Sequence, residues 1–275
     1  MNIQWYPGHM AKATRLIKED LKNVDIIIKL LDSRAVLRSE NKDFNKIINQ
    51  KKSIKIYNKS DLSDEKATKE WISYFKDKNE DVFFIDSISK KGINEVVEYL
   101  NSLKSKFRSN REVRAMVVGI PNVGKSMFIN SITKKSNAKT GNRPGVTLSK
   151  QWIKVKGELY LLDTPGVLPP KFENLEDGVC LASLGSVKET ILDREELCLK
   201  LIEFLIDNYP NNLKERYKLD NVNNPPLEVY EDIGRKRGFL LKGGEIDYLR
   251  TAVTVLDEFK NGQIGRMSFD KVSDL

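Results

Sequence analysis

The chain has 275 residues, of which 40% are hydrophobic and 31% charged, a composition typical of a soluble globular protein with room for two domains. No apolar run reaches the roughly 18 residues of a membrane span, and the first residues do not resemble a secretory leader. The two cysteines, Cys180 and Cys198, are too few for a disulfide framework or a metal site. We therefore expect a cytoplasmic protein. The formal net charge of +8 is uneven, because residues 1–175 carry 33 Lys and Arg against 20 Asp and Glu, whereas residues 176–275 carry 14 against 19.

Short runs rich in β-branched residues alternate with helical stretches up to residue 165. The runs that predict buried parallel strands are Asp25–Leu31, Ser53–Tyr57, Val82–Ile85 and Ala115–Val118. Gln151–Val155 and Glu158–Leu162 flank Lys156-Gly157 and predict a β-hairpin. Apolar residues from Ile93 to Phe107 recur at helical spacing. This alternation predicts a doubly wound α/β sheet for residues 1–175.

The second predicted strand ends in a motif typical of guanine recognition. Asn58-Lys59-Ser60-Asp61 fits the pattern N-K-x-D. The Asp61 carboxylate can accept hydrogen bonds from the ring N–H and the exocyclic amine of guanine, and each such charge-assisted bond contributes roughly 1.5–3 kcal/mol. Lys59 would pack its stem across the ring, and Asn58 would tie neighbouring loops together. After the third strand, Ser87-Ile88-Ser89 partly matches the Ser-Ala-Lys loop that braces the base.

The fourth predicted strand leads into a phosphate-binding loop. Residues 119–126, Gly-Ile-Pro-Asn-Val-Gly-Lys-Ser, match G-x-x-x-x-G-K-[ST] and precede a helical run, Met127–Ile132. Successive backbone N–H groups would turn inward as an anion nest, next to the positive end of the helix. Lys125 would reach the β- and γ-phosphates, and Ser126 would ligate magnesium. The residues expected to contact nucleotide are Asn122, Val123, Gly124, Lys125, Ser126 and Met127.

A second phosphate motif follows the predicted hairpin. Asp163-Thr164-Pro165-Gly166 fits D-x-x-G, so that Asp163 would hold magnesium through its water shell and the Gly166 N–H would sense the γ-phosphate. Between the two phosphate motifs, Thr147 in the run Arg143–Thr147 is a candidate magnesium ligand and catalytic residue.

The chain changes character after Leu168-Pro169-Pro170. No convincing strand follows, while Leu197–Tyr209 and Ile246–Phe259 carry helical apolar stripes. We expect a small all-helical domain over residues 176–275, in which both cysteines are buried thiols.

The order of the motifs is permuted. In ordinary GTPases the phosphate-binding loop comes first and the base motif last, whereas here the base motif at 58–61 precedes the loop at 119–126 and D-T-P-G at 163–166. The same sheet forms if the usual termini are joined through the basic stretch Ser102–Arg114 and the chain is opened after D-T-P-G. The γ-phosphate-sensing loop then runs directly into the helical domain, so nucleotide state would re-aim that domain.

This order resembles the circularly permuted GTPases, and among them the bacterial GTPases of late large-subunit ribosome assembly. The resemblance extends to Trp5–Met10 (WYPGHM), Asp32-Ser33-Arg34, Gly234–Gly238 and Gly265–Phe269, although Ser33 stands where the family has alanine. It implies a circularly permuted P-loop GTPase sheet followed by a small helical domain. It also implies hydrolysis of GTP to GDP with Mg²⁺, and a large-subunit precursor of rRNA and ribosomal proteins as partner, with no membrane or DNA partner.

Two basic surfaces are candidates for contact with rRNA phosphates. Lys12, Arg15, Lys18 and Lys22 fall on one face of the first predicted helix. Arg235-Lys236-Arg237 and Lys242 form a second spot on the otherwise acidic helical domain. A solvated helix face and a polar turn are the alternatives, since lysine-rich surfaces also occur without an anionic partner. The run Arg108–Arg114 is more typical of a linker.

No glutamine follows Gly166 to orient the attacking water, because Val167 occupies that position. His9, the only histidine in the chain, is a candidate catalytic residue for this task; a surface or capping histidine is the alternative. Asn122 resembles the asparagine of potassium-stimulated GTPases, where it helps hold K⁺ against the phosphates; a loop-stabilising side chain is the alternative.

Three functions remain open from the sequence. The first is a GTPase that controls assembly of the large ribosomal subunit. The second is a regulatory GTPase switch that acts on a protein partner rather than the ribosome. The third is a nucleotide-gated RNA-binding module that barely hydrolyses GTP.

Overall fold

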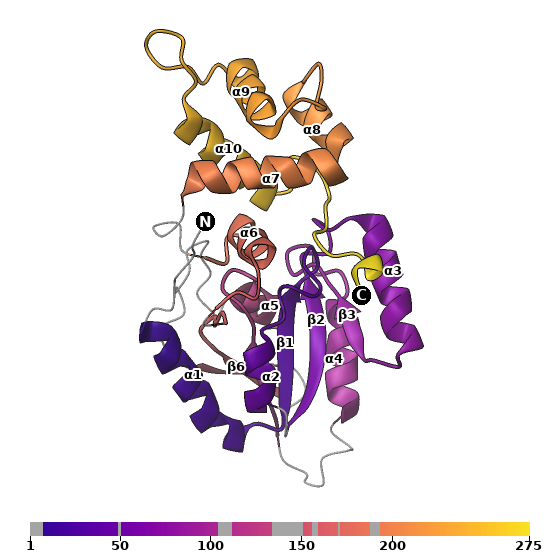
Figure 1. Ribbon diagram of the computed structural model, residues 1–275. Coiled ribbons are helices and arrows are strands. Elements are labelled where there is room, and N and C mark those ends of the chain that lie inside the picture. Colours follow the sequence, from indigo (N-terminus) through magenta and orange to yellow (C-terminus); the bar gives the residue numbers. More distant parts are fainter. Residues whose placement is uncertain are drawn as a thin grey trace. The chain divides into compact units, whose positions relative to one another are not determined.

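The computed structural model describes residues 8–48, 51–103, 112–133, 151–155, 159–169, 171–187 and 193–275. They form two compact units, and Figure 1 colours their elements along the chain. The sheet unit contains the described residues up to Lys171 together with Ser268–Leu275, and the helical unit runs from Phe172 to Met267. The sequence placed the division at 175/176 and assigned the whole C-terminal end to the helical domain. In the structure, residues 268–275 belong instead to the sheet unit.

The sheet unit contains six strands among its described residues, each within two residues of a predicted one. They are β1 (Ile26–Asp32), β2 (Lys52–Asn58), β3 (Val82–Phe84), β4 (Val113–Val118), β5 (Gln151–Val155) and β6 (Leu159–Asp163). Their order is β3-β2-β1-β4-β6-β5. Neighbouring strands are parallel except β5 and β6, which form the predicted antiparallel hairpin.

The strand order positions the motifs at one edge of the sheet. The chain runs outward through β1, β2 and β3, and then returns to place β4 on the other side of β1. In open α/β sheets, ligands bind outside the carboxyl ends of the strands at such a change of direction. Asp32, Asn58 and Asp163 are the last residues of β1, β2 and β6, and the phosphate-binding loop follows β4.

One face of the sheet is covered by three helices (Figure 1). The helices α1 (Gly8–Asp20) and α2 (Lys42–Ile48) pack on it through Ala13, Ile17, Phe44 and Ile48. Further along the same face, Trp71 and Phe75 of α3 (Glu65–Asp77) form an aromatic stack with Tyr57. The remaining helices of the unit, α4 (Ile93–Ser102) and α5 (Lys125–Ile132), pack against each other. The predicted stripe from Ile93 to Phe107 is helical up to Ser102, and Phe107 lies outside the described residues.

The helical unit is built around α7, as the apolar stripes predict. Its helices are α6 (Leu175–Ser183), α7 (Arg194–Asn208), α8 (Pro210–Tyr217), α9 (Pro226–Arg237) and α10 (Tyr248–Lys260). The central helix α7 contacts each of the other four. Cys180 and Cys198 are buried in this core as thiols that form no disulfide, in agreement with the prediction. In the described ranges no helix has the length and apolar character needed to cross a membrane.

Candidate functional site

The loop between β4 and α5 has the tight geometry that its glycines predict. Gly124 adopts φ +98°, and a Cβ added there would lie 2.4 Å from Nδ2 of Asn58. A Cβ on Gly119 would lie 2.2 Å from the carbonyl oxygen of Leu30. Because both positions exclude a side chain, they hold the loop close to the ends of β1 and β2.

Lys125 is folded back across this loop. It is buried, and its Nζ donates to the carbonyl oxygens of Gly119 at 3.1 Å and Ile120 at 2.8 Å. Burial lowers the pKa of Lys125 to about 8, although the Asp163 carboxylate opposes the shift. An anion held by the loop would favour the charged lysine, so the site is suited to phosphate groups.

The D-T-P-G segment lies directly against the phosphate-binding loop. Ser126 Oγ donates to Asp163 Oδ2 at 2.9 Å, and a Cβ on Gly166 would lie 2.6 Å from the backbone of Pro121. The Val167 N–H donates to the Gly119 carbonyl at 3.2 Å. A hydroxyl and a carboxylate side by side are the oxygen ligands that Mg²⁺ prefers, so these residues fit that ion.

The residue after Gly166 has no polar group to offer. Val167 is buried in the apolar cluster that contains Ile17 and Phe44. Its carbonyl oxygen accepts a hydrogen bond from Asn41 Nδ2 at 3.3 Å. The side chain therefore stabilises the core beneath the loop and cannot orient a water molecule.

Asn58 joins three loops of the site. Its Nδ2 donates to the carbonyl of Val123 at 2.9 Å, in the phosphate-binding loop. Its Oδ1 accepts from the backbone N–H of Ser87 at 3.1 Å and from Ser87 Oγ at 2.8 Å. The end of β2, the phosphate-binding loop and the Ser87–Ser89 loop are thus held in one arrangement.

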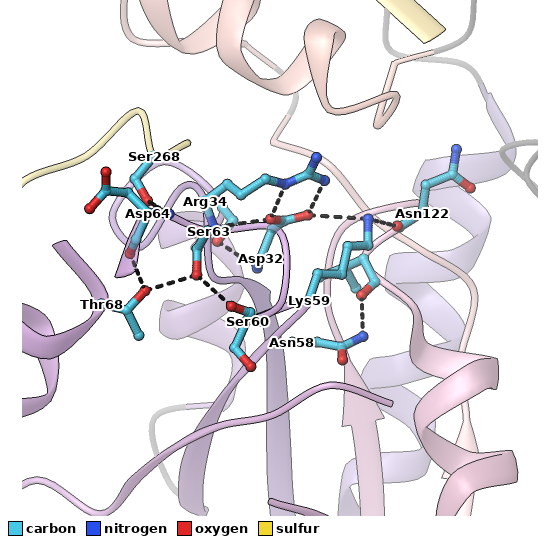
Figure 2. Close-up of polar contacts among 12 residues, drawn as sticks. Asp32, Arg34, Asn58, Lys59, Ser60, Ser63, Asp64, Thr68, Asn122 and Ser268 are labelled. Atoms are coloured by element: carbon cyan, nitrogen blue, oxygen red, sulfur yellow. Dashed lines mark hydrogen bonds and ion pairs between the residues drawn. The ribbon is translucent and has the colours of Figure 1, made fainter. Parts of the chain in front are cut away.

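Lys59 is held between two elements of the sheet unit (Figure 2). Its Nζ donates to the Asn122 carbonyl at 2.7 Å and lies 3.2 Å from Asp32 Oδ2. Asp32 also pairs with the Arg34 guanidinium through both carboxylate oxygens, at 2.9 and 3.0 Å. Burial alone would raise the pKa of the Asp32 carboxyl, but the charges of Arg34 and Lys59 outweigh it and hold that pKa well below its usual value.

Asp61 lies at the open side of this arrangement. Its side chain is exposed, whereas Asn58, at the end of β2, is buried. Partial desolvation and the nearby Asp86 carboxylate raise the pKa of Asp61. Asp86 in turn accepts from the backbone N–H groups of Ile88 at 2.8 Å and Ser89 at 3.1 Å. A carboxylate that is exposed and held on a fixed loop can accept donors from a ligand.

Comparison with known proteins identifies the family. Residues 114–232 match the 50S ribosome-binding GTPase family. Ribosome biogenesis GTPase A of Bacillus cereus is 43% identical over 98% of this chain and 94% of its own length. The protein of the same name from Thermotoga maritima is 30% identical over 99% and 96%. The chain belongs to the ribosome biogenesis GTPase A family.

Solved structures agree with this assignment. GDP-bound YlqF matches 94% of this chain with a TM-score of 0.73, and its own chain is covered completely (100%). GNP-bound YlqF from T. maritima matches 94% with a TM-score of 0.70, over 98% of that chain. Both are 26% identical. The protein is therefore a circularly permuted GTPase that binds guanine nucleotides, as the motif order predicted.

Some predicted residues of this GTPase lie outside the described residues. Thr147 is among them, and so are Trp5, Tyr6 and Pro7. His9 falls in the first turn of α1, but its side chain is not among those described. Ser60 is placed by its backbone N–H, which donates to the Ile85 carbonyl at 3.0 Å. The Ile88 side chain is 77% exposed and thus open to a ligand.

Sequence reasoning used Asp32 and Arg34 only as a family marker and missed the contact of Asp32 with Lys59. The sequence did indicate such a contact, because Asp32 is a charged residue at the end of a predicted buried strand. In the structure it lies opposite Asn58 in the register of β1 and β2. A charged residue in that position requires a partner, and Lys59 is the next residue after Asn58.

The two basic surfaces of this GTPase differ. Lys12, Arg15, Lys18 and Lys22 are all exposed, and Arg15 forms an ion pair with Glu19 at 3.7 Å in which both side chains remain exposed. On α9, by contrast, each cation has an acidic partner: Arg235 pairs with Glu231 and Asp232, Lys236 with Asp220, and Arg237 with Glu258. The α9 spot is therefore less available to an external anion than the sequence suggests.

Proposed function

We propose that this GTPase is an assembly factor for the large ribosomal subunit, and that its nucleotide state controls association with and release from the precursor particle. The observation that carries the proposal is the 43% identity to ribosome biogenesis GTPase A of B. cereus over 98% of the chain. The excess of basic residues in residues 1–175 supports it, because clustered cations gain free energy when they displace counterions from RNA phosphates.

Within this function, the guanine base is recognised by Asp61, with Lys59 against the ring and Asn58, Ser60, Ser87 and Ile88 shaping the loop. The phosphates are held by the backbone of residues 122–127 and by Lys125. Ser126, Thr147 and Asp163 hold Mg²⁺, which supplies positive charge to the phosphates when bound. The N–H of Gly166 senses the γ-phosphate.

Hydrolysis requires a group other than Val167 to orient water. His9 is that group in our proposal, and it acts when the particle orders the residues around it. Asn122 provides a ligand for K⁺, so hydrolysis is faster in potassium than in sodium at equal ionic strength.

Sedimentation with purified large-subunit particles tests the proposal. The protein loaded with GTP or a non-hydrolysable analogue should co-sediment with the particles, and the protein loaded with GDP should largely remain in the supernatant. Binding should weaken steeply with added salt. Small subunits serve as the control particle.

Each other outcome would favour a different function. Nucleotide binding without any association with particles would support a regulatory GTPase that acts on a protein partner. Equal association in every nucleotide state, with no hydrolysis, would support an RNA-binding module in place of a switch.

A further inference from the structure

The residues that follow the helical unit lie in the sheet unit, next to the loops that carry the base motif. We call Ser268–Asp270 the C-terminal clasp. The Asp270 carboxylate is buried, and it accepts from the backbone N–H groups of Leu37 at 2.7 Å and Arg38 at 3.1 Å. It also pairs with the Arg38 guanidinium. The Asp270 carbonyl accepts from Trp71 Nε1 at 3.2 Å.

The other two residues of the clasp hold the same neighbourhood. The Phe269 N–H donates to the Arg34 carbonyl at 2.7 Å. Ser268 Oγ accepts from the Asp64 N–H at 3.1 Å, at the start of α3 (Figure 2). The clasp thus connects the segment after β1, which contains Arg34, with the segment after the base motif, which begins α3.

A continuous chain of polar contacts leads from the clasp to the base site. Arg34 is buried, and its backbone is fixed by Phe269 while its guanidinium grips Asp32. Asp32 holds Lys59 Nζ, which also bonds to the carbonyl of Asn122. Figure 2 shows Asp32 between Arg34 and Lys59.

The geometry makes Lys59 dependent on this chain. Asp32 compensates two cations in a region shielded from water, where an uncompensated charge is costly. If the segment that carries Arg34 shifts, the two-pronged contact with Asp32 is lost, since such a pair tolerates little change of angle. Asp32 is then free to turn, and Lys59 loses the partner that fixes its amino group beside the phosphate-binding loop.

We propose that the C-terminal clasp is part of the guanine-recognition machinery, and that Asp270 is a positioning residue which acts through Arg34 and Asp32 on Lys59. This inference rests on the proposed assignment of the base to residues 58–61. It adds the clasp, which is distant in the sequence, to the residues that shape the base site. Asp270, for example, contacts Arg38 across a separation of 232 residues.

Nucleotide binding by clasp variants tests the proposal. Asp270→Ala should weaken GDP and GTP binding by at least about tenfold, within the usual range of coupling between sites. The ratio of GTP to GDP affinity should not change, because the effect arises at the base and not at the γ-phosphate. For the same reason KM should rise while kcat at saturating GTP stays within about twofold. Asp270→Asn should show a smaller loss, and Asp77→Asn, an exposed position at the end of α3 away from the clasp, should bind as the wild type does.

A double-mutant cycle separates positioning from a general loss of structure. If the clasp acts through Asp32, then Asp270→Ala should have little further effect in a protein that already carries Asp32→Asn. Equal losses in both backgrounds would overturn the proposed route, as would unchanged affinity in folded Asp270→Ala.

Hydrogen exchange tests the proposal on the wild-type protein, so the result does not depend on whether a variant folds. Because coupling is reciprocal, GDP should slow exchange at the amides of Phe269 and Leu37. Unchanged exchange there would contradict the proposal. The assignment of the base to residues 58–61 is checked separately by Asp61→Asn. If Asp61→Asn binds GTP normally, that assignment is wrong. If GTP affinity falls with Asp61→Asn but not with Asp270→Ala, only the proposal for the clasp is rejected.

Discussion

Two carboxylates with different surroundings lie together in the region proposed to bind the base. Asp86 accepts two backbone N–H groups and so fixes the loop that contains Ile88. Asp61 is exposed and available to a ligand. Their proximity is unfavourable, because like charges raise the free energy of each ionised group. Partial desolvation and the charge of Asp86 together raise the pKa of Asp61.

Asp61→Asn should exchange the base preference of the protein. The amide offers a donor where guanine has its amine, whereas xanthine presents a carbonyl there. We expect GTP affinity to fall by at least about tenfold, which corresponds to the loss of one charge-assisted bond, and xanthosine triphosphate affinity to rise. Competition titrations with both nucleotides measure the exchange. Coinciding GTP curves for variant and wild type would place the guanine site elsewhere.

Guanine affinity should also depend on pH through Asp61. The ionised carboxylate binds the base, so affinity is complete above the pKa of Asp61 and is lost as pH falls through it. Because this pKa is raised, the loss should begin at a higher pH than for an ordinary aspartate. Asp86→Asn removes the neighbouring charge and should move the acid limb to lower pH.

GDP titrations across the acid range, compared as a ratio of variant to wild type, cancel the titration of the nucleotide itself. Asp77→Asn, at the end of α3, is a control of the same type away from the site. Superimposable profiles for Asp86→Asn and wild type would exclude this interaction between the two carboxylates.

Ser33 stands where the resemblance described above predicts alanine, and the structure shows what its hydroxyl costs. Its hydroxyl is buried and has no hydrogen-bond partner among the described residues. Burying such a group costs about 1–3 kcal/mol. Ser33→Ala should therefore stabilise the sheet unit, by about 1 kcal/mol, and raise its Tm by roughly 2–4 °C.

Ser39→Ala provides a matched comparison, because Ser39 Oγ accepts from the Asp32 N–H at 3.1 Å. Removal of that acceptor should lower the Tm by a similar or larger amount. Thermal unfolding followed by circular dichroism compares the two variants. A lower Tm for Ser33→Ala would indicate that its hydroxyl has a partner after all.

At the scale of elements, helix α1 is the better candidate for an RNA-binding surface. Lys12, Arg15 and Lys18 of this helix are exposed, while Ala13 and Ile17 anchor the opposite face in the core. On α9, the guanidinium of Arg237 bonds to both oxygens of Glu258, at 2.8 and 3.1 Å, so it stabilises the helical unit itself. Charge reversal on α9 should hence be limited to Arg235 and Lys236.

Lys12→Glu combined with Lys18→Glu should weaken binding to large-subunit particles without changing nucleotide affinity. The dependence of binding on salt should become shallower, since fewer counterions are released. The matched control reverses Lys66 and Lys76, two exposed lysines of α3. Equal loss in both double variants would indicate a general effect of charge rather than a surface on α1.

The elements differ in how well the sequence predicts them. The strands of the sheet were predictable because buried parallel strands are short runs of apolar, β-branched residues, and the motifs at their ends confirmed their direction. The short helix α2 has only seven residues, with Phe44 and Ile48 buried, which is too short for a clear periodicity. The clasp shows no helical or strand periodicity, because it is held by individual backbone and side-chain contacts with residues more than 190 positions earlier in the chain.

The residues of the candidate site likewise divide into those that a local sequence pattern predicts and those that depend on the fold. Asn58, Asp61, Lys125 and Asp163 belong to motifs whose spacing is fixed by their chemistry, so their neighbourhood was predictable. The contacts of Asp32 with Lys59 and of Asp270 with Arg38 depend on which strands and segments become neighbours. That information is in the fold and not in local patterns.

At the scale of the whole molecule, GTP hydrolysis should depend on the ribosomal particle through His9. His9→Ala should retain binding of GTP and of particles but lose most particle-stimulated hydrolysis, so that the complex persists on GTP. Phosphate release with and without particles measures the effect. Because the chain has no other histidine, a pH dependence of hydrolysis at about pH 6.5 that wild type shows and His9→Ala lacks would be attributable to His9, since the titration of the nucleotide is common to both proteins. Full stimulated turnover in the variant would return His9 to a surface role.

The discontinuity of the sheet unit has a consequence for biosynthesis. Residues 172–267 are synthesised after the strands of the sheet but before the clasp that joins the segments around Arg34 and Asp64. Domains generally fold as units in the order of their synthesis. Here the first unit cannot close until the second has been translated, so a nascent chain would carry an incompletely braced base site throughout that interval. A nascent chain should therefore bind GTP more weakly than the finished protein, by about the factor expected for Asp270→Ala.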